Sequence, residues 1–174
     1  MRHLNIEIKA KATNQEEVGR ILTSRQASFK GLDHQIDTYF NVPLGRLKLR
    51  EGNIENYLVQ YNRPNQEGPK QSDVVLYKPS ILGVSSLKEA LTKSLGVLAV
   101  VDKKREIYFI DNVKFHLDAV QDLGTFVEIE AIDKVPSIGR ERLLEQCEFY
   151  QALFGILPTD LISVSYSDLI LAGR

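Results

Sequence analysis

The stretch Asn5-Ile6-Glu7-Ile8-Lys9-Ala10-Lys11 decides the fold, because polar and apolar side chains alternate along it. Alternation with a period of two places the charges of a strand on one face and its apolar residues on the other. Segments 46–50, 103–109 and 126–131 repeat the pattern. Carboxylates gather on the first and last of these strands, and cations mostly on the strands between them. We expect the apolar faces to pack outward against helices, so that the charges line a closed barrel.

Length and composition bound the class of protein. A chain of 174 residues is long enough for one domain with a sizeable core, 1–174. The net charge of -1 gives no overall attraction to nucleic acid or to an acidic membrane surface, so neither is expected as a partner. The single cysteine, Cys147, excludes an internal disulfide and fits a reducing compartment. No apolar run is typical of a signal peptide or of a membrane span, and a cytoplasmic protein is expected.

The order of strand and helix patterns predicts the fold class. Strands are expected at about 2–11, 35–42, 45–51, 55–63, 71–79, 97–110, 113–119 and 125–132. Capping-box signatures at Thr13 and Ser86 predict two helix starts, and a longer amphipathic helix is expected after Pro136. These helices need an apolar surface, which the outward faces of the strands can supply. The predicted class is α+β, an antiparallel barrel-like sheet with helices packed outside it.

Four carboxylates have the parity that turns them away from the apolar face of their strand. They are Glu7, Asp118, Glu128 and Glu130. Inward carboxylates repel one another unless a cation joins them, and oxygen ligands suit Mg²⁺ or Mn²⁺, usually with a phosphate completing the coordination. Each of these residues alone fits a solvated strand face better. The set of four, however, favours a metal site.

Six cations on four strand segments form a complementary set. They are Lys9, Lys48, Arg50, Arg63, Lys103 and Arg105. Arginine pairs bidentately with phosphate oxygens and lysine adds a point charge, so the set suits a triphosphate, although each cation alone fits a surface position. Lys104 has the opposite parity, and Lys11, at a strand end, stays unassigned. The sequence contains no Walker-type loop, dinucleotide fingerprint or nucleophile elbow, so side chains must hold any phosphate.

The order of these segments resembles that of CYTH-domain proteins, the triphosphate tunnel metalloenzymes, which include class IV adenylyl cyclases, thiamine triphosphatases and inorganic triphosphatases. The resemblance covers nearly the whole chain. Its carriers are Glu7-Ile8-Lys9, Asp37-Thr38-Tyr39-Phe40, 46–50, 61–64, Lys103-Lys104-Arg105, Leu117-Asp118 and Glu128-Ile129-Glu130. The segment 37–50 is most similar to the cyclase-like branch. The resemblance implies an eight-stranded antiparallel tunnel with a triphosphate inside.

The resemblance also implies roles for single residues. The metal-binding glutamates of the family match Glu7, Glu128 and Glu130. The lysine that closes the N-terminal signature matches Lys9. The phosphate-holding cations match Lys48, Arg50, Arg63, Lys103 and Arg105, and the candidate catalytic residues are Lys9 and Arg105. The family signature begins with a glutamate where this chain has Asn5, so a second metal site would lack one charge.

The expected function is divalent-metal-dependent chemistry on a triphosphate, most like the conversion of ATP to cyclic AMP and pyrophosphate by a class IV adenylyl cyclase. One alternative is hydrolysis of tripolyphosphate or thiamine triphosphate. Another is binding of ATP or polyphosphate without catalysis, if Asn5 disables the metal site. The expected partners are Mg²⁺ or Mn²⁺ and a triphosphate-containing small molecule such as ATP or tripolyphosphate, and a homodimer is allowed.

Overall fold

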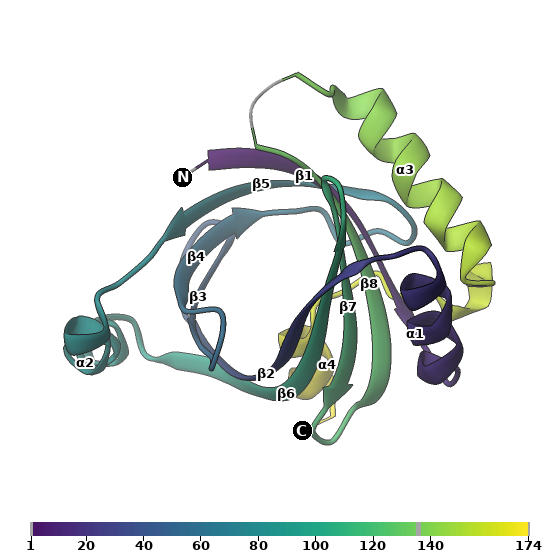
Figure 1. Ribbon diagram of the computed structural model, residues 1–174. Helices are drawn as coiled ribbons and strands as arrows, with labels where there is room; N and C mark the ends of the chain where they lie inside the picture. The colour runs from purple at the N-terminus through teal and green to yellow at the C-terminus, as the bar shows by residue number, and fades with distance from the viewer. Residues whose placement is uncertain (1, 135–136, 174) are drawn as a thin grey trace.

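The computed structural model describes residues 2–134 and 137–173 of the chain. Its sheet is a closed barrel of eight antiparallel strands in the order β1-β5-β4-β3-β2-β6-β7-β8 (Figure 1). The strands are β1 (Arg2–Lys11), β2 (Ser28–Phe40), β3 (Arg46–Glu51), β4 (Tyr57–Asn62), β5 (Lys70–Tyr77), β6 (Val97–Ile110), β7 (Val113–Val120) and β8 (Gly124–Asp133). The α+β class and the antiparallel barrel predicted from the alternation are therefore confirmed.

Strand β2 begins at Ser28, earlier than the predicted start at residue 35. Its partner β6 has 14 residues, and the far end of β6 pairs with the added part of β2, with Ser28 opposite Phe109. A bulge between Phe29 and Gly31, where Gly31 has a φ of 127°, interrupts this pairing. The bulge breaks the period of two, so the extension is hidden in the sequence pattern.

Helices and short turns connect the strands and follow the last one. In the described part of the chain they are α1 (Gln15–Ser24), η1 (Ile81–Gly83), α2 (Val84–Leu95), α3 (Arg140–Leu153), η2 (Pro158–Asp160) and α4 (Tyr166–Ala172). None of these described helices has both the length and the apolar composition needed to cross a membrane.

The largest hydrophobic core lies between the barrel wall and helices α1 and α3, which cover one side of the barrel (Figure 1). Ile6, Ile8 and Ala10 of β1 point out of the barrel into this core, as the alternation of β1 predicts. Leu22 of α1 and Leu143 of α3 are fully buried in the same core. Burying a side chain of this size contributes roughly 1.5–3 kcal/mol. The polar face of β1 is thereby turned toward the inside of the barrel.

Both predicted capping boxes are wrong. Asn14, not Thr13, is the N-cap of α1, and its side chain makes no capping hydrogen bond. Helix α2 begins at Val84, so Ser86 lies inside the first turn. This helix continues directly from η1, whose turn is closed by a hydrogen bond to the backbone oxygen of Ser80. The preceding turn therefore sets the start of α2.

A C-terminal segment that the sequence pattern did not predict closes one end of the barrel. Leu161 forms a bridge with Ala10 of β1, and a capping box of Ser165 with Asp168 begins α4. The ring of Tyr166 is buried in the barrel interior, with its centroid 4.9 Å from that of Phe126. Figure 1 shows α4 within the outline of the barrel. The interior therefore has a closed end at Tyr166.

Cys147 of α3 is expected to be unreactive in the folded protein. Its side chain is fully buried and its Sγ donates to the backbone oxygen of Ile6 at 3.2 Å. Burial raises the pKa of this thiol to about 12, so the reactive thiolate is scarce at mildly alkaline pH. A chromogenic disulfide reagent should label the protein only after guanidinium unfolds it. Labelling of the native protein at the unfolded rate would contradict this.

Candidate active site

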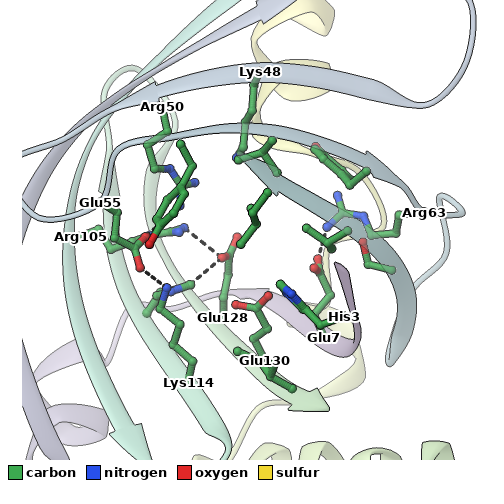
Figure 2. Close-up of a pocket in the computed structure, with 18 of the residues that line it drawn as sticks. His3, Glu7, Lys48, Arg50, Glu55, Arg63, Arg105, Lys114, Glu128 and Glu130 are labelled. Atoms are coloured by element: carbon green, nitrogen blue, oxygen red, sulfur yellow. Dashed lines mark hydrogen bonds and ion pairs between the residues drawn. The ribbon is translucent and has the colours of Figure 1, made fainter. Parts of the chain in front are cut away.

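The inside of the barrel contains a cavity of about 630 Å³, a volume typical of small-molecule sites (Figure 2). Among the described residues that line it, nine are lysine or arginine and four are glutamate. The whole chain has a net charge of -1, so positive charge is concentrated in this cavity. Such a cavity is suited to a small polyanion.

The predicted phosphate-binding cations come together on the wall of this cavity. All six line it: Lys9, Lys48, Arg50, Arg63, Lys103 and Arg105. Lys104 of β6, which has the opposite parity, is exposed, and Lys11 at the end of β1 is exposed as well. The period-two pattern thus gave the correct side of each strand, while the binding role of each cation stays a prediction.

Asp37 of β2 is the counterion of three of these cations. Its Oδ1 accepts from Arg50 Nε at 2.8 Å. Its Oδ2 accepts from Lys48 Nζ at 2.8 Å and from Lys103 Nζ at 2.6 Å. Burial alone would raise the pKa of Asp37, but the three cations outweigh burial and hold this pKa well below its ordinary value. One carboxylate facing three cations leaves an excess of positive charge.

Arg105 of β6 is held by Asp118 of β7, the residue opposite it in the sheet. Arg105 Nε donates to Asp118 Oδ1 at 2.6 Å, and Arg105 Nη2 donates to Oδ2 at 2.5 Å. The Tyr166 hydroxyl donates to the same Oδ2 at 2.7 Å. Asp118 is fully buried and is not one of the described residues that line the cavity. Asp118 therefore positions the guanidinium of Arg105. This geometry adds no support to the predicted role of Asp118 as a metal ligand.

Glu128 of β8 joins a lysine, an arginine and a histidine at the centre of the site. Its Oε1 lies 3.1 Å from Lys9 Nζ, and its Oε2 lies 2.9 Å from both Arg105 Nη2 and His116 Nδ1. Burial and the charges of Arg105 and Lys114 lower the pKa of His116 to about 3, so its ring is neutral. The carboxylate can only accept, which puts the proton on Nδ1.

His116 Nε2 consequently carries a lone pair. This atom is buried and has no hydrogen-bond partner among the described residues. No role for His116 was predicted from the sequence. The signal that could have found it is parity, since His116 lies between Lys114 and Asp118 at the same spacing along β7.

Lys70 is a second functional candidate that sequence reasoning missed, because the predicted strand began one residue later. It is fully buried, and its Nζ donates to the backbone oxygens of Ile162 at 2.7 Å and Ser163 at 3.1 Å. Burial and the nearby charges of Arg63 and Lys9 lower the pKa of Lys70 to about 7. Neither of these two bonds is to a carboxylate, so the protonated form of Lys70 adds positive charge near Arg63.

Glu7 and Glu130 are neighbours on one wall, because they lie opposite each other on β1 and β8 (Figure 2). Glu7 forms an ion pair with Arg63. Glu130 accepts a hydrogen bond from Asn5 Nδ2, and it has no ion pair with the described residues. Burial raises the pKa of Glu130, and the charge of Glu128 adds to this effect. Asn5 Oδ1 is buried and has no partner among the described residues.

Comparison with protein families decides the assignment. The family model of the CYTH domain matches residues 3–157. The chain belongs to the CYTH-domain family. No curated protein matches the chain.

Solved structures with the same fold match this chain over nearly its whole length. The PH1012 protein of Pyrococcus horikoshii is 25% identical, with a TM-score of 0.73, and the match covers 95% of this chain and 98% of that chain. A candidate adenylate cyclase of Vibrio parahaemolyticus is 16% identical, with a TM-score of 0.74 and 97% and 98% coverage. A candidate adenylyl cyclase of Hippeastrum, described as having a dominant triphosphatase activity, is 16% identical, with a TM-score of 0.62 and 99% and 96% coverage.

CYTH triphosphate tunnel metalloenzymes depend on divalent metal ions, and the residues of this CYTH domain fit such an ion in part. Within the described ranges, no three His, Cys, Asp or Glu side chains are grouped so that they could hold an ion by themselves. Mg²⁺ is commonly bound by one or two carboxylates together with substrate phosphates. Glu7 and Glu130 would supply the carboxylates, and the unpartnered Asn5 Oδ1 would supply a further oxygen. The donors therefore fit an ion that binds together with phosphate.

Asn5→Glu is expected to make the stability of this CYTH domain strongly dependent on metal. The new carboxylate would replace an amide that donates to Glu130, so two carboxylates would share one hydrogen-bonding position and repel each other. We expect a lower Tm than wild type in chelator, and a larger rise of Tm on adding Mn²⁺. Asn5→Ala, which removes the hydrogen bond without adding charge, is the control. An unchanged metal dependence of Tm would show that Asn5 does not limit metal binding.

Proposed function

We propose that the protein is a divalent-metal-dependent enzyme that acts on a triphosphate compound, and that ATP is converted to cyclic AMP and pyrophosphate. The observation that carries this proposal is an excess of cations in a cavity that is closed at one end. Among the described residues, nine lysine and arginine side chains line it against four glutamates, and Asp37 and Asp118 behind the wall are further counterions. Buried cations in surplus are costly, and burial lowers the pKa of both Lys9 and Lys103. A bound polyanion would offset that cost.

The cations have separate tasks in this proposal. Lys9, near the closed end, and Lys48 would bind phosphate oxygens as point charges, while Arg63 would bind them with its planar fork. Arg105, fixed by Asp118, would hold the phosphate that reacts and stabilise charge that develops on it. A divalent ion held by Glu7 and Glu130 would add charge neutralisation on the phosphate chain.

Aromatic side chains support a nucleotide as the substrate. Tyr57, Tyr77 and Phe109 line the same cavity as the cations. The flat face of an adenine ring can pack against such side chains. In the cyclase reaction the ribose 3′-hydroxyl attacks the α-phosphorus and pyrophosphate leaves. His116 Nε2 could accept a hydrogen bond from a hydroxyl donor, because it is an unpartnered acceptor on the cavity wall.

A triphosphatase is the second candidate, and the Hippeastrum protein favours it, because that candidate cyclase is described as having a dominant triphosphatase activity. In this reaction water attacks the terminal phosphorus, so the cavity needs no nucleoside site. The same cations and the same carboxylates would serve it. Fold alone does not separate the two reactions.

A substrate panel tests the proposal. ATP, GTP, thiamine triphosphate and tripolyphosphate would each be incubated with Mg²⁺ or Mn²⁺, and cyclic nucleotide, pyrophosphate and phosphate measured separately. Cyclic AMP with pyrophosphate is the expected result. Phosphate without cyclic nucleotide would assign the triphosphatase reaction. Binding without any product would overturn both and leave a polyphosphate-binding protein.

A further inference from the structure

Glu55 is a cavity-lining carboxylate that lies on the loop between β3 and β4, residues 52–56, and not on a strand. Asp33 of β2, which is fully buried, holds this loop in place by accepting hydrogen bonds from its backbone. Asp33 Oδ1 accepts from the backbone N–H of Ile54 at 2.8 Å, and Oδ2 accepts from the N–H of Glu55 at 2.9 Å. The backbone N–H of Glu55 is therefore itself anchored to the buried Asp33 carboxylate.

Further contacts make the same loop rigid. The backbone N–H of Gly52 donates to Asn56 Oδ1 at 3.1 Å, and Asn56 Nδ2 donates to the oxygen of Gly52 at 2.8 Å. A Cβ at Gly52 would lie 2.7 Å from Asp33 Oδ1 and from the backbone oxygen of Glu55. Backbone hydrogen bonds at Gly52, Ile54 and Glu55 therefore hold the loop in this conformation, and with it the position of Glu55 in the wall.

The carboxylate of Glu55 pairs with two cations of the cavity (Figure 2). Its Oε2 accepts from Arg50 Nη1 at 3.0 Å, and its Oε1 pairs with Lys114 Nζ. Burial alone would raise the pKa of Glu55, but the charges of Lys114 and Arg50 outweigh burial and hold it far below its ordinary value. Glu55 is therefore ionised, and it neutralises part of the positive field at this position.

These two cations lie away from the closed end. Arg50 is four residues along β3 from Arg46, whose Nη2 contacts Asp168 of α4 at 2.8 Å. Lys114 is four residues along β7 from Asp118, which accepts from Tyr166. Four residues of strand span about 13 Å. The backbone positions of Arg50 and Lys114 are thus roughly 13 Å along their strands from the residues that contact α4, and Glu55 pairs with both of these cations.

We propose that Glu55 limits the length of the phosphate chain that the cavity accepts, an inference that rests on the proposed function. A chain that enters toward Lys9, whose Nζ lies 3.8 Å from the Tyr166 ring centroid, extends back from the closed end along β3, past Lys48 and toward Arg50. A phosphate beyond the third would meet the Glu55 carboxylate and two cations that it already neutralises. A neutral ribose meets no such repulsion there. The cavity is therefore selective for triphosphates over longer chains.

Glu55→Gln tests this inference, because it removes the charge and keeps the size of the side chain. Calorimetry would measure binding of tripolyphosphate, tetrapolyphosphate and pentapolyphosphate in the presence of Mg²⁺. The wild type should favour tripolyphosphate, and in Glu55→Gln the affinity for the longer chains relative to tripolyphosphate should rise at least about tenfold. Glu51→Gln is the control, since Glu51 belongs to the same hairpin but pairs with Lys88 on α2 at 2.6 Å.

The outcomes separate this inference from the proposed function. If the wild type binds no triphosphate, the proposed function fails and the inference fails with it. If the wild type binds tripolyphosphate but the ratio between chain lengths is the same in Glu55→Gln, only the role of Glu55 is overturned. Should Glu55→Gln not fold, Asp33→Asn, which weakens the hydrogen bonds to the loop, is expected to shift the ratio in the same direction. An unchanged ratio in that variant would overturn the role of Glu55.

Discussion

Asp37→Ala is expected to lower the free energy of unfolding by about 3–5 kcal/mol, the range for removing one partner of a buried ion pair. The reason is that Asp37, at 1% exposure, is the shared counterion of Lys48, Arg50 and Lys103. Arg50 keeps Glu55 as a partner, but Lys103 loses the only carboxylate that contacts it among the described residues. Denaturant unfolding monitored by circular dichroism measures the loss.

The control for this variant is Asp102→Ala. Asp102 forms an exposed pair with His34, 2.7 Å between Nε2 and Oδ1, and such pairs contribute about 1 kcal/mol or less. The folded-state pKa of Asp37 lies below its unfolded value, so its stabilisation is present above the unfolded pKa and disappears as pH falls through the folded pKa. The free energies of unfolding of the wild type and of Asp37→Ala should therefore become similar in strong acid. A loss as small as that of the control would show that Asp37 is not the counterion of the cluster.

Lys9→Met is expected to lower kcat/KM for the triphosphate substrate by about 10²–10³. The lysine would bind phosphate oxygens, and loss of one such charged donor weakens the interaction with the phosphate charge in the transition state as well as in the bound substrate. Folding stability should change little. Lys9 pairs with Glu128, but Glu128 keeps Arg105 and His116 as partners, and the neutral methionine stem fills much of the same buried space. Steady-state kinetics and thermal unfolding of the same preparation separate the two effects.

Lys11→Met is the matched control for Lys9→Met. It lies two residues further along β1 with the same parity, but it is exposed at the strand end. Its activity should equal that of the wild type. An equal loss of activity in both variants would mean that the overall charge of β1 matters and not the contact of Lys9. A large loss of stability in Lys9→Met would mean that this lysine is structural.

The barrel, and the side of the sheet on which each cation lies, could be predicted from the sequence. Successive side chains of a strand point to opposite faces, so the face of a residue is predicted correctly even when the predicted ends of the strand are wrong. Lys103 and Arg105 share a parity that Lys104 lacks, and only the first two line the cavity. The start of β2 could not be predicted, since the bulge at Gly31 breaks the alternation.

The pairing inside the cavity could not be predicted, because it depends on register between strands. Asp37 of β2 lies opposite Arg50 of β3, but Lys103 of β6 lies opposite Gln35 of β2. The side chain of Lys103 therefore reaches two residues along β2 to contact Asp37. Glu55 lies on a loop, where no periodicity marks the direction of a side chain. The plug at Tyr166 depends on contacts between the last helix and the barrel interior, which no local pattern in α4 reveals.

Closure of the barrel joins β1, at the start of the chain, to β8, whose partner residues lie more than a hundred positions later, with Leu4 opposite Asp133. During synthesis this last seam cannot form until β8, which ends at Asp133, has left the ribosome. Pairing between such distant segments raises the contact order, so we expect folding in the slow range of β-rich domains. Until the seam forms, β1 and β8 each have an unpaired edge, and the nascent chain is most exposed to intermolecular association at that stage.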